Sequence, residues 1–261
     1  MQERHTDIRR YFEEQAITTQ RFVIPYIAEV MPITASTTVL EIGCGEGGNL
    51  RPFLELGCKV TGVDIMPARI AKAEEYFADH PQRANLTLIA DDMYNRTAAD
   101  GTFDLIIMRD VIEHIHNQEK FMAFVKQFMK PQGKFFLAFP PWYMPFGGHQ
   151  QICRNKVLSK LPFYHILPTF LYKGILKAFG ESPKTIDDLL EIKETGISLE
   201  RFERILRKEN YHIDKRTWWF INPNYETKFG MKKRVQTKLI TAIPFVRNFF
   251  VTAGYYVISK K

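Results

Sequence analysis

Short apolar runs alternate with amphipathic segments along the first 140 residues of this chain. Five runs are typical of buried strands, and they cover residues 38–42, 59–65, 85–92, 103–110 and 134–140. The segments between them carry apolar residues at helical spacing, and Gly57 and His80-Pro81 act as stop signals. A strand and helix order repeated through five strands predicts a doubly wound parallel α/β sheet.

The remaining segments extend this pattern on both sides. Residues 2–31 predict two helices, and residues 196–221 predict a helix capped by Ser198 followed by a sixth strand. Residues 249–261 predict a further strand. Two segments are additional, 141–195 and 222–248. Because ligands of open α/β sheets bind beyond the carboxyl ends of the strands, the first is expected to form a lid, whereas the place of the second stays open.

Four glycines lie within six residues directly after the first strand, in the segment TVLEIGCGEGG of residues 38–48. They predict a tight strand-to-helix turn at which backbone approaches a nucleotide-type cofactor. Gly43, Gly45 and Gly48 satisfy the pattern of dinucleotide sites, so NAD is one alternative and a purely structural turn is another. Glu41 and Glu46 would repel a pyrophosphate but attract an ammonium and a sulfonium. The charges therefore favour S-adenosylmethionine.

The run E-I-G-C-G-E-G closely resembles the first motif of class I S-adenosylmethionine-dependent methyltransferases. F-D-L-I-I-x-x-D-V-I-E-H-I and K-P-Q-G-K-F resemble later motifs of the same family. The resemblance covers about residues 37–140 and is weaker over 196–221 and 249–261. It implies a Rossmann-like seven-stranded sheet of order 3-2-1-4-5-7-6 with an antiparallel last strand. We expect one domain, 1–261, with cap helices at 1–36, a cofactor-binding core at 37–140, the lid at 141–195, and the last helix and strand pair at 196–261.

Acidic residues at the strand ends are the candidate cofactor ligands. Asp64 ends the second strand, where a carboxylate can accept both ribose hydroxyls of either S-adenosylmethionine or NAD. The resemblance implies that Asp91 or Asp92 accepts the adenine amino group and that Met93 covers the ring. It also implies that the N-terminal helices bring Tyr11 and Arg21 to the cofactor, although packing and surface charge are the alternative. The full predicted set is Tyr11, Glu41, Gly43, Cys44, Gly45, Gly47, Asp64, Ile65, Asp91, Asp92, Met93 and Arg109.

Two histidines are candidates for the chemistry of transfer. A hydroxyl acceptor needs a base, whereas an unprotonated amine does not. His149 follows the fifth strand in the aromatic segment PPWYMPFGGHQQ, and we predict it as base or orienter. His114 follows the fourth strand and is the second candidate. The alternative for both is a structural histidine.

Asp110, Glu113 and His114 form D-x-x-E-H, similar to the E-x-x-E-H element by which some quinone-pathway and small-RNA methyltransferases hold a divalent cation. Here the first acid is Asp rather than Glu. Packing and charge at a helix start are the commoner explanation of these residues, so we predict no metal.

Charge and composition narrow the class of methyl acceptor. The net charge is +7, of which residues 151–184 contribute +5 and residues 222–261 contribute +7, leaving −5 for the rest. Together with the aromatic lid, this predicts O-methylation of a small or lipid-like apolar acceptor. The alternatives are methylation of RNA or protein across the basic face, although no clear nucleic-acid module is present, and a protein that binds S-adenosylmethionine without turnover.

The chain also carries signals about its location. Its three cysteines form no C-x-x-C pair, and residues 1–10 are charged rather than apolar, so a cytoplasmic location is expected. Residues 161–181 combine apolar residues near helical spacing with lysines. They predict either a lid packed on the domain or a segment in peripheral contact with a membrane surface.

Overall fold

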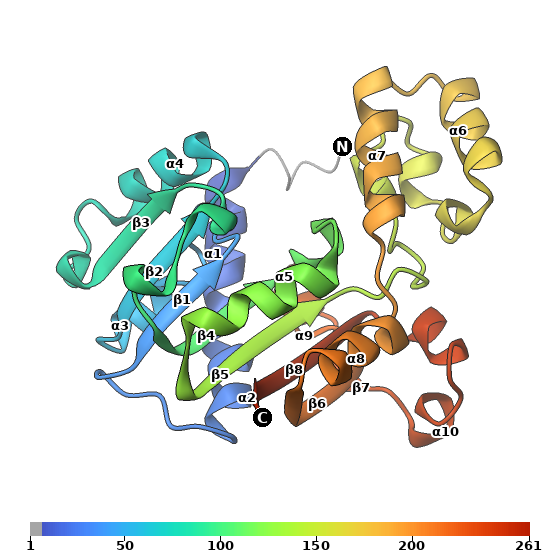
Figure 1. The fold of residues 1–261 in the computed structure, drawn as a ribbon. Helices are drawn as coiled ribbons and strands as arrows, with labels where there is room; N and C mark the ends of the chain where they lie inside the picture. The colour runs from blue at the N-terminus through green and yellow to red at the C-terminus, as the bar shows by residue number, and fades with distance from the viewer. Residues whose placement is uncertain (1–6) are drawn as a thin grey trace.

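The computed structural model describes residues 7–261, which form one mixed sheet covered by helices (Figure 1). The strand order is β3-β2-β1-β4-β5-β8-β6-β7. Strands β1 to β5 are parallel to one another, and β8 is antiparallel to both of its neighbours. The strands are β1 Thr38–Ile42, β2 Lys59–Asp64, β3 Leu86–Ala90, β4 Phe103–Arg109, β5 Met129–Phe139, β6 Tyr211–Ile221, β7 Arg234–Val235 and β8 Ala253–Lys260.

The predicted doubly wound sheet is confirmed, and its order differs from the prediction only by one added edge strand. β7 belongs to the segment 222–248 and pairs with β6 at Trp219 and Ile221. A two-residue strand has no hydrophobic period of its own, so the sequence carries no signal for it. β5 begins at Met129, earlier than predicted, because a register shift opposite Phe103 lets the strand accommodate Pro131.

Most helices fill predicted places with different bounds, whereas those at 183–195, 223–229 and 238–241 lie in the two additional segments and were not predicted. The helices are α1 Ile8–Thr18, α2 Ile24–Ala28, α3 Arg51–Glu55, α4 Pro67–Phe77, α5 Gln118–Val125, α6 Thr169–Ala178, α7 Pro183–Thr195, α8 Leu199–Lys208, α9 Pro223–Phe229 and α10 Lys238–Thr241. A π-helical turn, Thr19–Val23, joins α1 to α2, so the two N-terminal helices run into each other. Residues 2–6 of that prediction lie outside the described residues.

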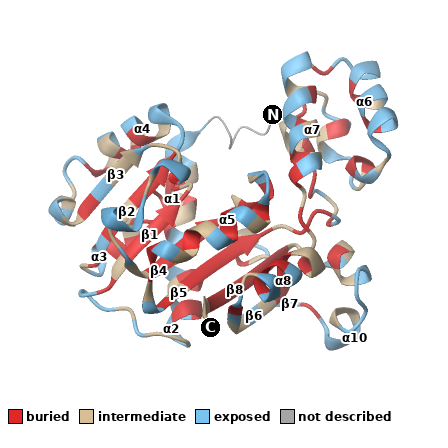
Figure 2. Cartoon of the chain, in the orientation of Figure 1, coloured by how far each residue is buried: buried red, intermediate tan, exposed pale blue. Residues whose placement is uncertain are grey.

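Two apolar layers cover the two faces of the sheet, and Figure 2 shows its central strands buried. On one face the core includes Phe121 of α5 and Phe202 of α8. On the other it includes Phe12 of α1, Phe53 of α3 and Phe77 of α4. Because both faces are covered, the strand ends are the places where the sheet can meet a ligand.

The segment 141–195 builds a small apolar core of its own beside the sheet (Figure 1). α6 and α7 form its walls, and Tyr172, Leu176 and Leu189 are fully buried between them. The helical spacing predicted from residue 161 is wrong before Thr169, where Tyr164–Ile166 is a single 3-10 turn. Pro168 explains the difference, because the residue before a proline is disfavoured in a helix.

Candidate cofactor and acceptor site

The glycine turn after β1 requires glycine for two physical reasons. Gly43, Gly45 and Gly47 have φ of 72°, 54° and 85°, in the left-handed region that side chains disfavour. A Cβ at Gly43 would also lie 2.5 Å from Cγ2 of Val111, and one at Gly47 would lie 2.8 Å from Cε2 of Phe77. The turn is therefore a bare stretch of backbone at the carboxyl end of the sheet, where a ligand can approach closely.

Asp64 is fixed beside this turn. One carboxylate oxygen accepts the Gly45 N–H at 2.8 Å, and the other accepts the Met66 N–H at 2.9 Å. Each oxygen retains a further lone pair, so the carboxylate can still accept two adjacent hydroxyls. The next side chain, Ile65, is 67% exposed and offers apolar surface at the same strand end. This combination fits an adenosine.

A buried polar network lies beneath the turn. Glu41 accepts one hydrogen bond, from Asn49 Nδ2 at 2.7 Å, and its Oε2 has no partner among the described residues. Asn49 Oδ1 accepts from Arg109 Nη1 and from the Thr19 hydroxyl. Burial raises the pKa of Glu41 to about 8, against the lowering effects of Asn49 and Arg109. The carboxyl group would gain from a cationic partner.

The charge argument from the sequence is wrong for Glu46. Its two carboxylate oxygens accept from Arg69 at 2.9 and 3.0 Å, so its charge is already neutralised. Arg69 follows Pro67 on α4, and nothing in the local sequence pairs it with Glu46. The carboxyl groups that remain to meet a cationic ligand near the turn are those of Glu41 and Asp64.

The end of β3 holds the acids expected near the adenine. Asp91 Oδ1 accepts from the Asp92 N–H and from Asn95 Nδ2, both at 2.8 Å, and the bond from Asn95 is the main cause that lowers the Asp91 pKa. Asp92 caps the turn through the Tyr94 N–H at 2.9 Å. Met93 is buried in the core cluster. Both acids therefore have local structural roles, and the geometry does not choose between them.

The other predicted cofactor residues lie around this turn. Cys44 is fully buried, and burial raises the pKa of its thiol. Arg109 is buried in the network under the turn. Arg21 forms an ion pair with Glu226 of α9 at 3.0 Å.

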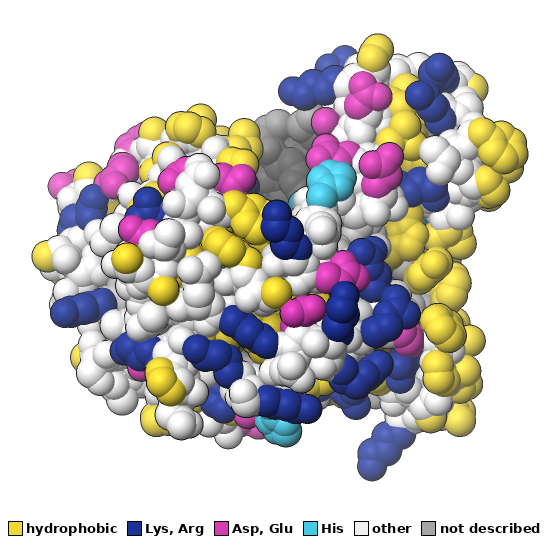
Figure 3. All heavy atoms as spheres, viewed as in Figure 1, with side chains coloured by type: hydrophobic (Ala, Val, Ile, Leu, Met, Phe, Trp, Pro, Cys, Tyr) yellow, Lys and Arg dark blue, Asp and Glu magenta, His cyan; other side chains and the backbone are white. Residues whose placement is uncertain are grey.

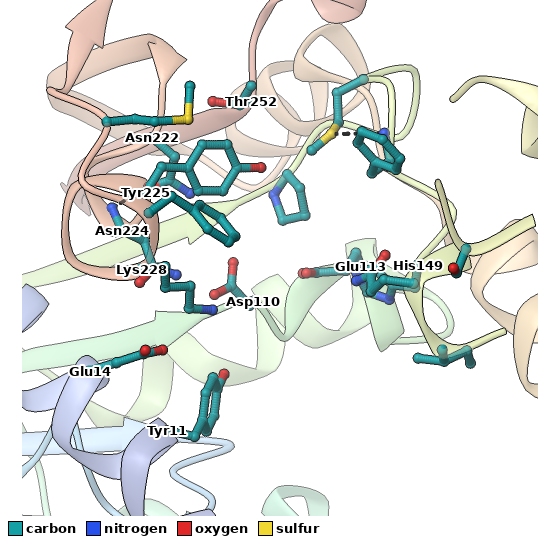
Figure 4. Close-up of a pocket in the computed structure, with 18 of the residues that line it drawn as sticks. Tyr11, Glu14, Asp110, Glu113, His149, Asn222, Asn224, Tyr225, Lys228 and Thr252 are labelled. Carbon is teal, nitrogen blue, oxygen red and sulfur yellow. Dashed lines mark hydrogen bonds between the residues drawn. The ribbon is translucent and has the colours of Figure 1, made fainter. Parts of the chain in front are cut away.

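A cavity of about 560 Å³ opens beside the strand ends, and Figure 4 shows it in close-up. Most of its walls come from four separate parts of the chain: α1, the turn after β4, the lid segment and the region of α9. Tyr11 lines it from α1, and burial raises the pKa of this tyrosine to about 12. α9 contacts α1 through hydrogen-bonded Thr227 and Thr18, 3.0 Å apart. The start of the second additional segment, whose place the sequence left open, thus forms a wall of the cavity.

The two candidate histidines meet at this cavity. The rings of His114 and His149 lie 5.0 Å apart between centroids, and His149 has φ 52°. Glu113 is buried beside them, and neither of its carboxylate oxygens has a partner among the described residues. Burial, followed by the charge of Asp110, raises the pKa of Glu113 well above its usual value. Burial also lowers the pKa of His114, so both groups are held neutral.

Glu113, His114 and His149 could also hold a metal ion, because their ligand atoms all lie within 4.8 Å of one another. This set differs from the D-x-x-E-H triplet considered from the sequence, since His149 replaces Asp110. One oxygen and two imidazole nitrogens suit a first-row transition metal better than Mg²⁺. The prediction of no metal stays a prediction.

The aromatic residues around His149 divide between two roles. Phe146 lines the cavity, whereas Trp142 packs edge-on against His165 and Tyr143 lies against Phe249. Gln151 lines the cavity with an Oε1 that has no partner among the described residues. Gln150 is instead a structural residue, because its side chain donates to Pro145 and lies fully buried.

Known methyltransferases resemble this chain in sequence. A family model described as a methyltransferase domain matches residues 12–151. The chain is 31% identical over 112 residues to a sterol 4-C-methyltransferase of Caenorhabditis elegans, covering 43% of this chain and 34% of that protein. It is 33% identical over 106 residues to a ubiquinone biosynthesis O-methyltransferase of Methylobacterium sp. (strain 4-46), covering 40% and 41%. The chain thus matches well under half the length of these relatives.

Solved structures agree on the fold. The glycopeptide N-methyltransferase MtfA, solved with sinefungin, has a TM-score of 0.55 at 15% identity, covering 93% of this chain and 87% of that one. The fold and the glycine turn define a Rossmann-like methyltransferase domain. The chain belongs to the class I S-adenosylmethionine-dependent methyltransferase family.

Proposed function

We propose that this protein transfers a methyl group from S-adenosylmethionine to a hydroxyl oxygen of a small or lipid-like apolar acceptor. The observation that carries the proposal is the cavity at the strand ends, which brings His114 and His149 together with apolar side chains. Met144, Phe146, Phe229 and Met231 supply much of that wall. The sterol and ubiquinone relatives support an acceptor of this class.

The described residues fit the cofactor. The backbone of Gly43 to Gly47 would lie against it, Asp64 would accept its ribose hydroxyls, and Ile65 would contact the base. The unsatisfied Glu41 carboxyl would lie on the side of its ammonium group. When bound, S-adenosylmethionine supplies an electrophilic methyl group, and the protein contributes position and proton transfer.

His149 is the proposed base. It lies on the lid side of the cavity and would accept the proton of the acceptor hydroxyl at an imidazole nitrogen. The neutral ring of His114, 5.0 Å away, does not oppose the charge that His149 gains, as an imidazolium there would. Gln151 and Glu113 offer polar atoms that can orient the acceptor hydroxyl.

A lipid-like acceptor resides in a membrane, so reaching such an acceptor would bring the enzyme to a membrane surface. Within residues 7–261, no helix combines the length and the apolar character that crossing a bilayer requires. Contact would therefore be peripheral for the described part of the chain.

The test is the variant His149→Ala assayed with short-chain isoprenoid catechols and a sterol. We expect the maximal rate to fall by about 10²- to 10⁴-fold, the usual contribution of a general base. Affinity for S-adenosylhomocysteine should change less than about threefold, because His149 lies on the acceptor side. His116→Ala is the matched control, since His116 is exposed and pairs with Glu191 instead.

Three outcomes would contradict the assignment. A normal rate in His149→Ala would remove His149 as base and make His114 the next candidate. Loss of wild-type activity in EDTA, restored by Mn²⁺, would show that Glu113, His114 and His149 hold a cation. Methylation of RNA with a steep salt dependence, and of no apolar acceptor, would favour the runner-up function across the basic face.

A further inference from the structure

Exposed apolar side chains are concentrated in the two segments that are additional to the family core. Of the 23 large hydrophobic residues exposed in the described chain, 16 lie in residues 141–195 and 222–250. Leu239, Phe170 and Phe245 stand out at 76%, 73% and 66% exposed. Contiguous exposed apolar surface on a folded protein marks an interaction site.

The two segments form one surface. Phe249 of the second segment contacts Tyr143 and Phe163 of the first, with ring centroids 5.6 and 6.1 Å apart. Figure 3 shows hydrophobic side chains running along one edge of the molecule, from the region of α6 to that of α10. We call the exposed apolar and basic residues of 156–179 and 229–250 the docking edge.

Part of this edge is held rigidly outward. Phe245 has φ 62°, an unusual value for an aromatic residue, and its N–H donates to Glu200 at 3.0 Å. Arg247 donates to the same carboxylate at 2.7 Å and to the Thr241 carbonyl at 3.0 Å. These bonds hold the loop in a strained conformation that leaves Phe245 in solvent.

Positive charge accompanies the apolar residues. Residues 151–184 carry a net charge of +5, and residues 228–250 carry six basic residues and no acid. Lys173 and Lys177 follow Phe170 by three and seven positions, so the three share one side of α6. Within the described residues, neither lysine is in an ion pair, and Lys156, Lys232 and Lys238 likewise lack an acidic partner. Four of the five acids of residues 141–195, Asp187, Asp188, Glu191 and Glu194, lie on α7. The fifth, Glu181, accepts from the backbone N–H groups of Arg154 and Asn155 at 3.1 and 2.9 Å.

We propose that the docking edge binds an anionic lipid bilayer and that the acceptor enters the cavity from that bilayer. The apolar side chains would enter the acyl region of the bilayer, and the lysines beside them would contact its anionic headgroups. Lys160, Phe229 and Met231 are exposed on the same two segments and also line the cavity, so its wall continues into the edge. The route for the acceptor rests on the proposed function, but binding to a bilayer does not.

The experiment is flotation of the full chain with phosphatidylcholine vesicles containing either no anionic lipid or 30% phosphatidylglycerol, without acceptor. We expect binding only to the anionic vesicles, weakened by high salt. Phe170→Ser with Leu239→Ser, and separately Lys173→Glu with Lys177→Glu, should each reduce partitioning about tenfold or more. Leu56→Ser and Lys59→Glu are matched controls, because both residues are exposed outside the docking edge.

Equal flotation of all variants, or no flotation of the wild type, would overturn the proposal. So would a dimer or a complex with another protein that buries the edge and that Phe170→Ser with Leu239→Ser disrupts. Circular dichroism melting confirms that the variants fold, since all four positions are exposed. If vesicle binding fails while apolar catechols are still methylated, only the docking edge is wrong. Vesicle binding without methylation of apolar catechols would support the docking edge and contradict the proposed class of acceptor.

Discussion

Glu41 shows how single buried groups link the site to stability. Its folded pKa of about 8 lies above its usual value of 4.5, so the folded state binds more protons than the unfolded state between these values. The contribution of Glu41 to the free energy of unfolding therefore falls as pH rises from about 4.5 to about 8. The network of Asn49 and Arg109 offsets only part of the cost of burial.

We predict that Glu41→Gln removes this dependence, because an amide keeps an oxygen for Asn49 and does not ionise. At pH 8 the variant should be more stable than the wild type by on the order of a few kcal/mol, with the difference vanishing near pH 4.5. Urea unfolding across this range measures it. Glu75→Gln is the control, since Glu75 forms an exposed pair with Lys72. If the free energies of unfolding of Glu41→Gln and the wild type changed with pH in parallel, Glu41 would not be the cause of this pH dependence.

At the scale of elements, the lid depends on a buried neutral histidine. His165 Nε2 donates to the Trp142 carbonyl at 2.8 Å, and its Nδ1 lies 3.3 Å from the Gln150 amide. Burial lowers the pKa of His165 to about 4 from its usual 6.5. The unfolded lid binds a proton in this range and the folded lid does not. The stability from His165 is therefore complete above pH 6.5 and is lost as pH falls toward 4.

We predict that the lid opens locally on acidification while the sheet stays closed. Hydrogen exchange of α6 and α7, corrected for intrinsic rates, should show lower protection at pH 4.5 than at pH 7. His165→Gln should flatten this difference, since glutamine can donate to Trp142 without titrating. His212→Gln, at an exposed site, should behave like the wild type. Equal loss of protection in α6 and in β1 would mean global acid unfolding instead.

At the scale of the whole molecule, the cofactor should bind between parts of the chain that are distant in sequence. Asp64 at the end of β2 bonds to the glycine turn, and α1 and α9 pack together and line the cavity. A ligand that binds only the folded state stabilises it by mass action, about 2.7 kcal/mol at a hundredfold excess over its Kd.

We predict that S-adenosylhomocysteine raises the melting temperature by several degrees and that Asp64→Ala abolishes the shift. Asp79→Ala, which removes an exposed acid from the turn after α4, should retain the shift. NADH should produce no shift in either. A shift with NADH in place of S-adenosylhomocysteine would refute the assignment of the cofactor residues.

The sequence alone determined the parallel sheet, the glycine turn and Asp64, because these follow from neighbours along the chain. Apolar runs predict strands wherever both faces are covered, and the left-handed φ values of Gly43, Gly45 and Gly47 need only local signals. Ser198 and Asn117 cap α8 and α5 as their positions indicate, since a cap bonds three residues away.

Only the tertiary structure decided which distant residues meet. His149 lies beside His114 because the lid segment folds back over the strand ends, and no spacing along the chain encodes that distance. Asn49 and Thr19 belong to the Glu41 network, and Arg69 neutralises Glu46, through contacts between separate elements. α9 reaches the cavity by packing on α1, more than 200 residues earlier. Which side chains pair between elements depends on how the helices pack on the sheet. The helices and strands themselves depend on the local pattern of apolar and polar residues.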